Sequence, residues 1–244
     1  MIRFLGLCVQ NFIECLKYIF GGHLRFKRVI AEAAYISYDS LPISLVIAFI
    51  AAAVIAIQVS KEFLMTGAEA YIGGTIAIVM IREIAPGFVA LAIGARAGTA
   101  ISAEIANMQV TSQVDAIKTL KIDPVGYYFA PRLLASALTV PMVVLIAEFI
   151  GIAGGMVVAN ATIGLHPHRY IESVWAWMHT KDIYISLLKS CIFGALIALV
   201  CATKGYETKG GAKEVGTSTT QAAILSTIYM LVADFLINLL FYVS

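Results

Sequence analysis

The chain has 244 residues, of which 60% are hydrophobic and only 13% are charged. Soluble domains average about 45–50% apolar and about 25% charged residues, so this composition indicates a membrane protein. The apolar content also excludes a disordered chain, and the formal net charge of +2 gives no sign of a nucleic-acid partner. The four cysteines form no CxxC pair, which favours small apolar packing residues over redox or metal ligands.

Five segments are long and apolar enough to cross a bilayer, which takes about 20 mainly apolar residues in a helix. They predict an all-α integral membrane protein with one domain over residues 1–244. Pro42 falls in the first turn of the first segment, where a helix tolerates proline. The third segment suits one long or tilted helix better than two. The predicted spans are 40–60, 70–95, 133–165, 183–203 and 215–244.

The region 1–39 precedes the first span and is more polar. No small-residue cleavage site follows Met1–Phe20, which argues against a signal peptide. The segment instead predicts a helix that lies in the membrane interface, with a basic cluster between residues 25 and 28 just beyond it. Its apolar sequence is interrupted by Gln10, Asn11, Glu14 and Lys17.

Lys and Arg residues are distributed unevenly over the connecting segments. Twelve of the 17 lie in the region up to residue 39, in the segment 96–132 and in the loop after the fourth span. Only three lie in the other two loops, residues 61–69 and 166–182. Because basic loops stay on the cytoplasmic side, this bias predicts a cytoplasmic N terminus and a periplasmic C terminus.

Five charged residues fall inside the predicted spans. A charge at the bilayer centre costs about 2.5–3.5 kcal/mol, so five lipid-facing charges would cost roughly 12–17 kcal/mol and most must face protein or water. Neighbours on a helix point about 100° apart, so Arg82 and Glu83 need separate partners; Lys189 is available to Glu83 and Asp234 to Arg82. One reading is buried helix-to-helix pairs, which we favour for Glu148 and Asp234. The other is a polar patch that handles a charged or zwitterionic substrate, which we favour for Arg82 and Glu83.

The segment 96–124 is too polar to span a membrane. Apolar residues recur at roughly helical spacing through residue 120, and Asp123-Pro124 ends the pattern. This predicts a helix on the inner face that docks a cytoplasmic partner, the alternative being a passive amphipathic helix on the membrane surface.

Several motifs in this part of the chain occur together in one known family. The run Arg82-Glu83-Ile84-Ala85-Pro86, the run from Gly94 to Ile105 and the segment 108–113 resemble the MlaE/YrbE permeases. These are membrane subunits of ABC transporters that work with MCE-domain proteins on lipids. The similarity continues through Asp123-Pro124, Pro131-Arg132, Lys189-Ser190, Gly205-Tyr206, Gly216 and Thr219-Thr220, and covers roughly residues 25–240.

The resemblance implies an interfacial N-terminal helix, five spans and a homodimer with a lipid cavity between its copies. It implies a substrate path at Arg82, Glu83 and Lys189, and coupling to an ATPase subunit through the region 96–124, where we assign Arg96, Glu104 and Asp115. The implied partners are an ABC ATPase, a periplasmic MCE-domain protein, a small STAS-type cytoplasmic protein, phospholipid and a second copy of the chain. The implied role is phospholipid transport that supports outer-membrane lipid asymmetry.

The chain lacks the motifs of several enzyme classes. It has no GxxxxGK[ST] loop, so ATP and magnesium are expected on a partner and no cofactor on this chain. HExxH and GxSxG are also absent, which gives no support to a membrane protease or hydrolase. Three histidines in the segment 166–182 lack the pattern of a zinc site.

These observations predict a non-enzymatic, multi-pass permease subunit in a bacterial cytoplasmic membrane, with a plastid inner envelope as the alternative location. The rival function is a proton-coupled carrier of a hydrophobic or amphipathic substrate, with Glu83, Glu148 and Asp234 as relay carboxylates. A passive scaffold for a membrane complex is the third reading.

Overall fold

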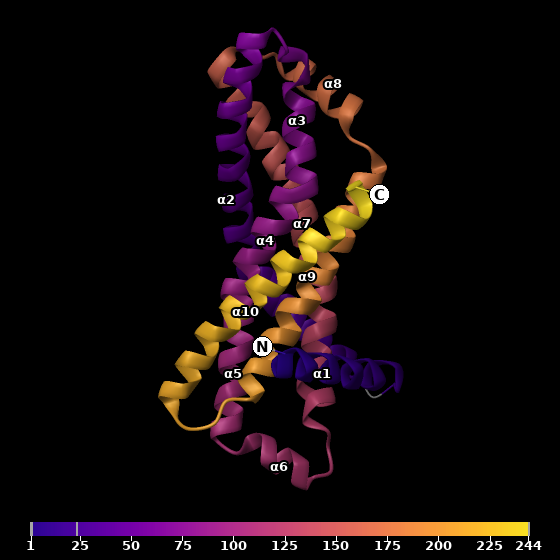
Figure 1. Cartoon of the computed structure of the whole chain (residues 1–244), viewed down its shortest axis with the longest axis vertical. Helices are drawn as coiled ribbons and strands as arrows, with labels where there is room; N and C mark the ends of the chain where they lie inside the picture. Colours follow the sequence, from indigo (N-terminus) through magenta and orange to yellow (C-terminus); the bar gives the residue numbers. More distant parts are fainter. Residues whose placement is uncertain (1, 23, 244) are drawn as a thin grey trace. The chain divides into compact units, whose positions relative to one another are not determined.

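A computed structural model describes residues 2–22 and 24–243 of the chain, and the segments it describes are helical (Figure 1). Met1 and Ser244, the outermost residues of the predicted interfacial helix and fifth span, lie outside the described residues. The first part of the chain forms α1 (Ile2–Phe20), α2 (Phe26–Thr66), the 3₁₀ turn η1 (Glu69–Tyr71), α3 (Ile72–Val79), the π-helical turn η2 (Met80–Ile84), α4 (Ala85–Ile93), the π-helical turn η3 (Gly94–Gly98), α5 (Thr99–Val110) and α6 (Gln113–Thr119). The remainder forms α7 (Pro124–Ile163), α8 (Pro167–Trp177), α9 (Thr180–Tyr206), α10 (Ala212–Asn238) and the π-helical turn η4 (Leu239–Val243).

Within the described residues, five helices are long and apolar enough to cross a membrane, which confirms the predicted fold class. The 40-residue α7 is one continuous helix, as the third span predicts. The spans nevertheless extend beyond the apolar runs at most ends, into polar sequence that includes exposed residues such as Lys61 and Glu62 of α2. The spanning helices are Phe26–Thr66, Glu69–Val110, Pro124–Ile163, Thr180–Tyr206 and Ala212–Phe241.

Two boundaries differ from the sequence prediction. Pro42 lies inside α2 instead of in its first turn, since the helix begins 16 residues earlier at Phe26. The segment 96–110 is not a separate inner-face helix: it continues the second span through η3 and α5. Only α6 is a separate helix. It begins after Ser112, whose left-handed backbone (φ 59°) lies in the turn between α5 and α6. A helix also occurs in the predicted outer loop, where His166 and Pro167 start α8.

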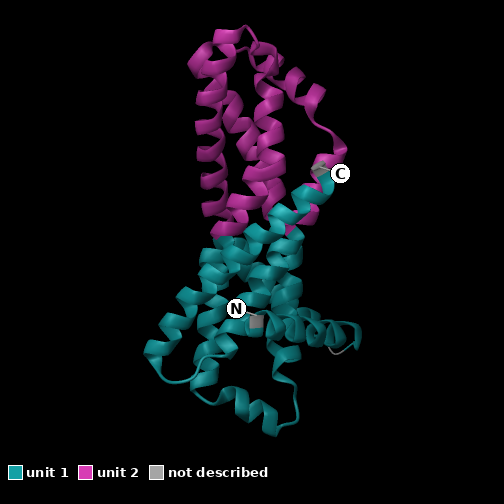
Figure 2. Ribbon diagram, viewed as in Figure 1, with its two compact units in different colours: residues 1–40, 93–140, 191–244 teal, residues 41–92, 141–190 magenta. Residues whose placement is uncertain are grey.

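The chain divides into two compact units (Figure 2). Unit 1 comprises residues 1–40, 93–140 and 191–244, and unit 2 comprises residues 41–92 and 141–190. The boundaries fall within helices α2, α4, α7 and α9. Neither unit is therefore a continuous stretch of chain, and each is built from segments far apart in sequence.

Close approach of helices organises unit 2. The backbone N–H of Gly74 in α3 donates to the Oγ of Ser173 in α8 at 2.9 Å, and a side chain at Gly73 would collide with the Tyr170 backbone. Along α7, a side chain at Gly155 would meet Ile76 at 2.9 Å. Glycines on α3 and α7 thus allow helices to pack closely inside one copy of the chain.

Unit 1 packs its π-helical turn η3 against α9. A Cβ at Gly98 would lie 2.9 Å from Ile197 and 3.0 Å from the sulfur of Cys201. The amphipathic α1 is fixed to the same helix by a hydrogen bond from the Asn11 amide to Thr203 Oγ1 at 3.0 Å, which is buried. Burial raises the pKa of the α1 thiols Cys8 and Cys15, to about 11 and about 12, so both stay protonated at neutral pH.

Candidate functional site

One face of α9 carries three polar residues that each meet a partner on another helix of unit 2 or in η2. Asp182, Ser186 and Lys189 follow one another at helical spacings of four and three residues, so their side chains share a face. All three are at most 3% exposed. The partners are Arg82 and Glu83 from η2 and Glu148 from α7. This polar stripe lies in the first half of α9, and a mainly apolar segment follows it from Cys191 to Ala202.

Lys189 binds the π-helical turn through two acceptors. Its ammonium donates to Glu83 Oε1 at 2.9 Å and to the backbone carbonyl oxygen of Arg82 at 2.8 Å. A π turn widens the helix and disturbs the regular carbonyl pairing, a distortion often found at functional sites. The predicted pairing of Lys189 with Glu83 is confirmed. The Lys189 side chain is fully buried, whereas Glu83 is 45% exposed.

Arg82 meets a carboxylate at the start of α9. Its Nε donates to Asp182 Oδ1 at 2.8 Å, and the Arg82 side chain is 35% exposed against 3% for Asp182. Asp182 lies in the predicted outer loop, so sequence reasoning missed it. Its spacing from Lys189, two helical turns along one face, is the signal that could have found it. The predicted pairing of Arg82 with Asp234 stays a prediction.

Glu148 occupies a different environment in the same unit. It is 4% exposed and accepts a short hydrogen bond from the hydroxyl of Ser186. A buried carboxyl group held by a neutral hydroxyl is suited to fixing α7 against α9. This contact agrees with the structural role that the sequence favoured for Glu148.

The Arg82 and Glu83 side chains project from adjacent positions and are 35% and 45% exposed. The guanidinium can donate to a phosphate, and the carboxylate can accept from an ammonium group. Because each is already held on one side by α9, both groups are positioned before any ligand arrives. The arrangement can therefore receive a ligand that carries both charges.

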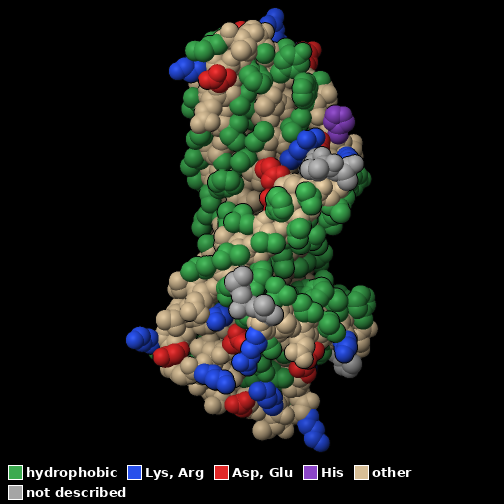
Figure 3. All heavy atoms as spheres, viewed as in Figure 1, with side chains coloured by type: hydrophobic (Ala, Val, Ile, Leu, Met, Phe, Trp, Pro, Cys, Tyr) green, Lys and Arg blue, Asp and Glu red, His purple; other side chains and the backbone are tan. Residues whose placement is uncertain are grey.

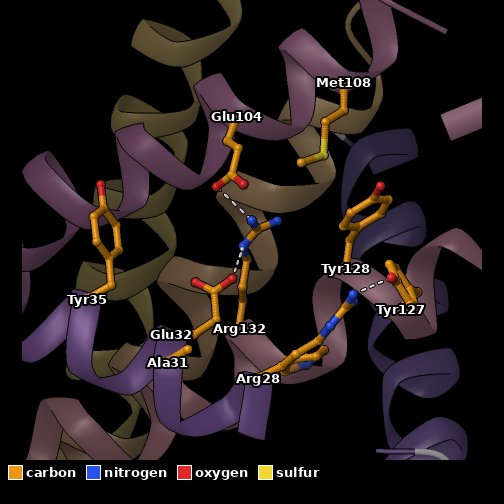
Figure 4. Close-up of a pocket in the computed structure, with 10 residues that line it drawn as sticks. Arg28, Ala31, Glu32, Tyr35, Glu104, Met108, Tyr127, Tyr128 and Arg132 are labelled. Carbon is orange, nitrogen blue, oxygen red and sulfur yellow. Dashed lines mark hydrogen bonds and ion pairs between the residues drawn. The ribbon is translucent and has the colours of Figure 1, made fainter. Parts of the chain in front are cut away.

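Unit 1 contains a second charged cluster, centred on Arg132 of α7 (Figure 4). The Arg132 guanidinium lies 3.2 Å from Glu32 Oε1 of α2 and 2.7 Å from Glu104 Oε2 of α5, and its side chain is 4% exposed. The cluster borders a cavity of about 480 Å³. Arg28 closes another side of this cavity with its guanidinium over the ring of Tyr127.

The structure does not bring the three predicted coupling residues together. Arg96 donates to Ser40 Oγ at 2.9 Å and pairs with Asp39 at 2.5 Å, which fixes the second span to α2. Glu104 belongs to the Arg132 cluster. Asp115 pairs with Lys118 of its own helix at 3.1 Å, and the Asp115 side chain is 63% exposed.

Of these three residues, Asp115 is therefore the most exposed to a partner, while Arg96 and Glu104 connect helices. In Figure 3, charged side chains gather on the visible face of unit 1 over α6 and its surroundings, whereas the visible face of unit 2 is mostly hydrophobic along its helices. No group of three His, Cys, Asp or Glu residues suited to a metal ion occurs in residues 2–22 and 24–243.

Comparison with known proteins agrees with this membrane architecture. The family described as Permease MlaE matches residues 29–240. A probable ABC transporter permease of Synechocystis sp. is 34% identical over 225 residues, which cover 92% of this chain and 86% of the relative. One from Rickettsia prowazekii is 35% identical over 90% of this chain and 85% of the relative. The chloroplastic protein trigalactosyldiacylglycerol 1 of Arabidopsis thaliana is 30% identical over 92% of this chain and 64% of its own length.

The matched residues 29–240 include nearly all of the five spanning helices, η2 with Arg82 and Glu83, and the α9 stripe. The family and the two probable permeases indicate that this chain is a transport component. The chain belongs to the MlaE permease family of ABC transporter membrane subunits.

Proposed function

We propose that this chain is the permease subunit of an ABC transporter that moves phospholipids between a bacterial inner membrane and an MCE-protein conduit toward the outer membrane. A separate ATPase subunit drives the transport. The resemblance to MCE-linked permeases supports the conduit. The Arabidopsis relative bears the name of a glycolipid, which supports a membrane lipid as the substrate class.

The observation that carries the proposal is the partial exposure of Arg82 and Glu83 in a spanning helix. An uncompensated charge at the bilayer centre costs about 2.5–3.5 kcal/mol. Lys189 pairs with Glu83 and leaves its carboxylate 45% exposed, and Asp182 pairs with Arg82, whose side chain is 35% exposed. An amine-bearing phospholipid headgroup would supply a further donor for Glu83, beside the cationic Arg82.

A second copy of the chain provides the other wall of this lipid path. Exposed apolar residues recur along one face of α10 every three or four positions, the spacing of a helix contact. Within one copy of the chain, only 11% of the most apolar 18-residue stretch of this spanning helix is buried. A homodimer through this face covers it. This face includes the exposed residues Ile224, Ile228, Leu231 and Phe235, and Val232 and Leu236 of the same helix are exposed as well.

The ATPase contact lies at α6 and the adjoining end of α5. The Lys and Arg distribution places this region on the cytoplasmic side, with a periplasmic C terminus and the MCE-domain protein across the membrane. Asp115 and Lys118 are exposed there, and a short helix between two turns can transmit movement into α5 and the second span. A STAS-type protein contacts the complex from the same side.

Reconstitution tests the proposal directly. Proteoliposomes would contain the chain, its ATPase and a fluorescent phospholipid, and transfer to a soluble MCE-domain acceptor would be followed with ATP or with a proton gradient. We expect transfer that needs ATP and falls at least tenfold in Glu83→Ala. Transfer by the chain alone on a proton gradient would support the rival carrier. Loss of the assembled complex in Glu83→Ala would assign that residue a structural role.

A further inference from the structure

A groove with apolar walls lies between α1, α9 and α10 in unit 1. Its volume is about 350 Å³. Val200 and Leu199 are buried against its floor, whereas Leu5 and Val9 on α1 are each half exposed at its edge. The lining residues are Leu5, Cys8, Val9, Phe12, Ile192, Ala195, Leu196, Leu199, Val200 and Tyr229.

The ammonium group of Lys204 lies beyond one end of this groove. The Lys204 ammonium lies 5.8 Å from the centre of the Phe4 ring, and that ring stacks on Tyr229 of the groove wall at 6.4 Å. Lys204 is one helical turn beyond Val200 on α9. No carboxylate pairs with Lys204 among the residues that the structure describes. The groove therefore offers apolar walls along its length and an ammonium near its end.

We propose that this groove holds one acyl chain of an anionic membrane phospholipid, with the lipid phosphate beside Lys204. The apolar walls match the acyl chain, since burial of its methylene groups is favourable and the chain has no polar group that would lose its hydrogen bonds there. The ammonium matches the phosphate, and this complementarity selects an anionic lipid over a zwitterionic one. The bound lipid fastens α1 to α9 and α10.

A second copy of the chain is the competing occupant, and the position of the groove argues against it. On α10, the exposed Ile228 and Leu231 point on average about 130° away from Tyr229 around the helix axis, given 100° per residue. A dimer through that face leaves the groove open to the bilayer. The groove is built from residues of unit 1 and includes none of Arg82, Glu83 and Lys189, so the inference does not depend on the transport proposal.

Photocrosslinking of the full chain tests the inference. The chain would be reconstituted in vesicles of phosphatidylcholine with a trace of phosphatidylglycerol that carries a diazirine in one acyl chain. After irradiation, mass spectrometry would locate the lipid adducts. We expect adducts concentrated on the α1 and α9 peptides that line the groove. Ala195→Phe fills the groove and should reduce these adducts at least fivefold, whereas Ala34→Phe, at an exposed position of α2, should leave them unchanged.

A substitution of Lys204 tests whether the groove prefers an anionic lipid. Lys204→Gln should lower the preference for the phosphatidylglycerol probe over the matching phosphatidylcholine probe about fivefold, the effect of one lysine near an anionic lipid surface. Lys209→Gln, in the exposed loop after α9, should lower it by less than twofold. Adducts spread evenly over all membrane helices and unchanged in Ala195→Phe would overturn the inference. Crosslinks from one copy of the chain into the groove of another would overturn it in favour of the second copy.

Discussion

The fully buried ammonium of Lys189 donates both to the carboxylate of Glu83 and to the backbone carbonyl oxygen of its neighbour Arg82. A single side chain thus binds the side chain and the backbone of the π-helical turn η2. Removing it would leave an acceptor carbonyl and a carboxylate without their donor. The geometry of η2 consequently depends on α9, a helix more than 100 residues away in sequence.

Substitution of Lys189 should therefore impair both stability and transport. Loss of one partner of a buried ion pair costs up to about 3–5 kcal/mol, and the 45% exposure of Glu83 reduces this figure to about 2 kcal/mol. We expect Lys189→Met to lower the amount of folded protein, measured by size-exclusion fluorescence. The double variant Lys189→Met with Glu83→Gln should recover folded protein but not lipid transfer. Recovery of transfer would show that both charges are structural.

The buried Glu148 should behave differently from Glu83. Its partner is a neutral hydroxyl, and an amide can keep a hydrogen bond with Ser186. We expect Glu148→Gln to change lipid transfer less than twofold and Glu83→Gln to lower it at least tenfold in the same proteoliposomes. A tenfold loss in Glu148→Gln, with normal amounts of folded protein, would support the proton-relay carrier.

The Arg132 cluster predicts a loss of stability that is separate from transport chemistry. Arg132→Leu removes the cation between Glu32 and Glu104 and leaves two carboxylates to repel each other. Because Glu104 is half exposed, we expect a loss of about 3 kcal/mol, at the lower end for a broken buried pair. Unfolding in detergent mixtures would measure it. Stability equal to the unsubstituted chain would contradict this account of the cluster.

The exposed ion pair between Asp115 and Lys118 on α6 predicts an effect on ATPase binding without an effect on stability. A surface ion pair contributes about 0–1 kcal/mol, so replacing Asp115 should hardly alter stability. We expect Asp115→Lys to weaken ATPase binding at least tenfold, measured by titration in nanodiscs, because it reverses a charge at the proposed contact. Glu62→Lys, on the exposed end of α2, serves as the matched control and should leave binding unchanged. Equal ATPase affinity in both variants would move the contact away from α6.

Close packing at η3 gives a prediction that needs no partner. A Cβ at Gly98 would come within 3.0 Å of both Ile197 and Cys201, whereas Gly87 has open space around the same position. Gly98→Val should destabilise the chain by about 1–3 kcal/mol through overpacking, and Gly87→Ala should not. Thermal stability in detergent distinguishes the two. A stable Gly98→Val variant would show that α9 is free to move at this point.

The sequence predicted the number of spans because five apolar runs exceed the bilayer thickness, which needs no knowledge of packing. It could not predict that 96–110 continues the second span, since contacts such as the ion pair of Arg132 with Glu104 form only in the folded chain. The pairing of Lys189 with Glu83 was predictable because buried opposite charges need each other. The partner of Arg82 was missed because Asp182 lies in sequence that reads as a loop, and only the fold places it on the face of α9 that carries Lys189.

Purification of the tagged chain from its native membrane in mild detergent tests the central claim most directly. Mass spectrometry would quantify the proteins and lipids that copurify with it. The account predicts two copies of the chain with a stoichiometric ATPase, an MCE-domain protein and bound phospholipid. An assembly of the chain alone, with neither ATPase nor phospholipid, would contradict it.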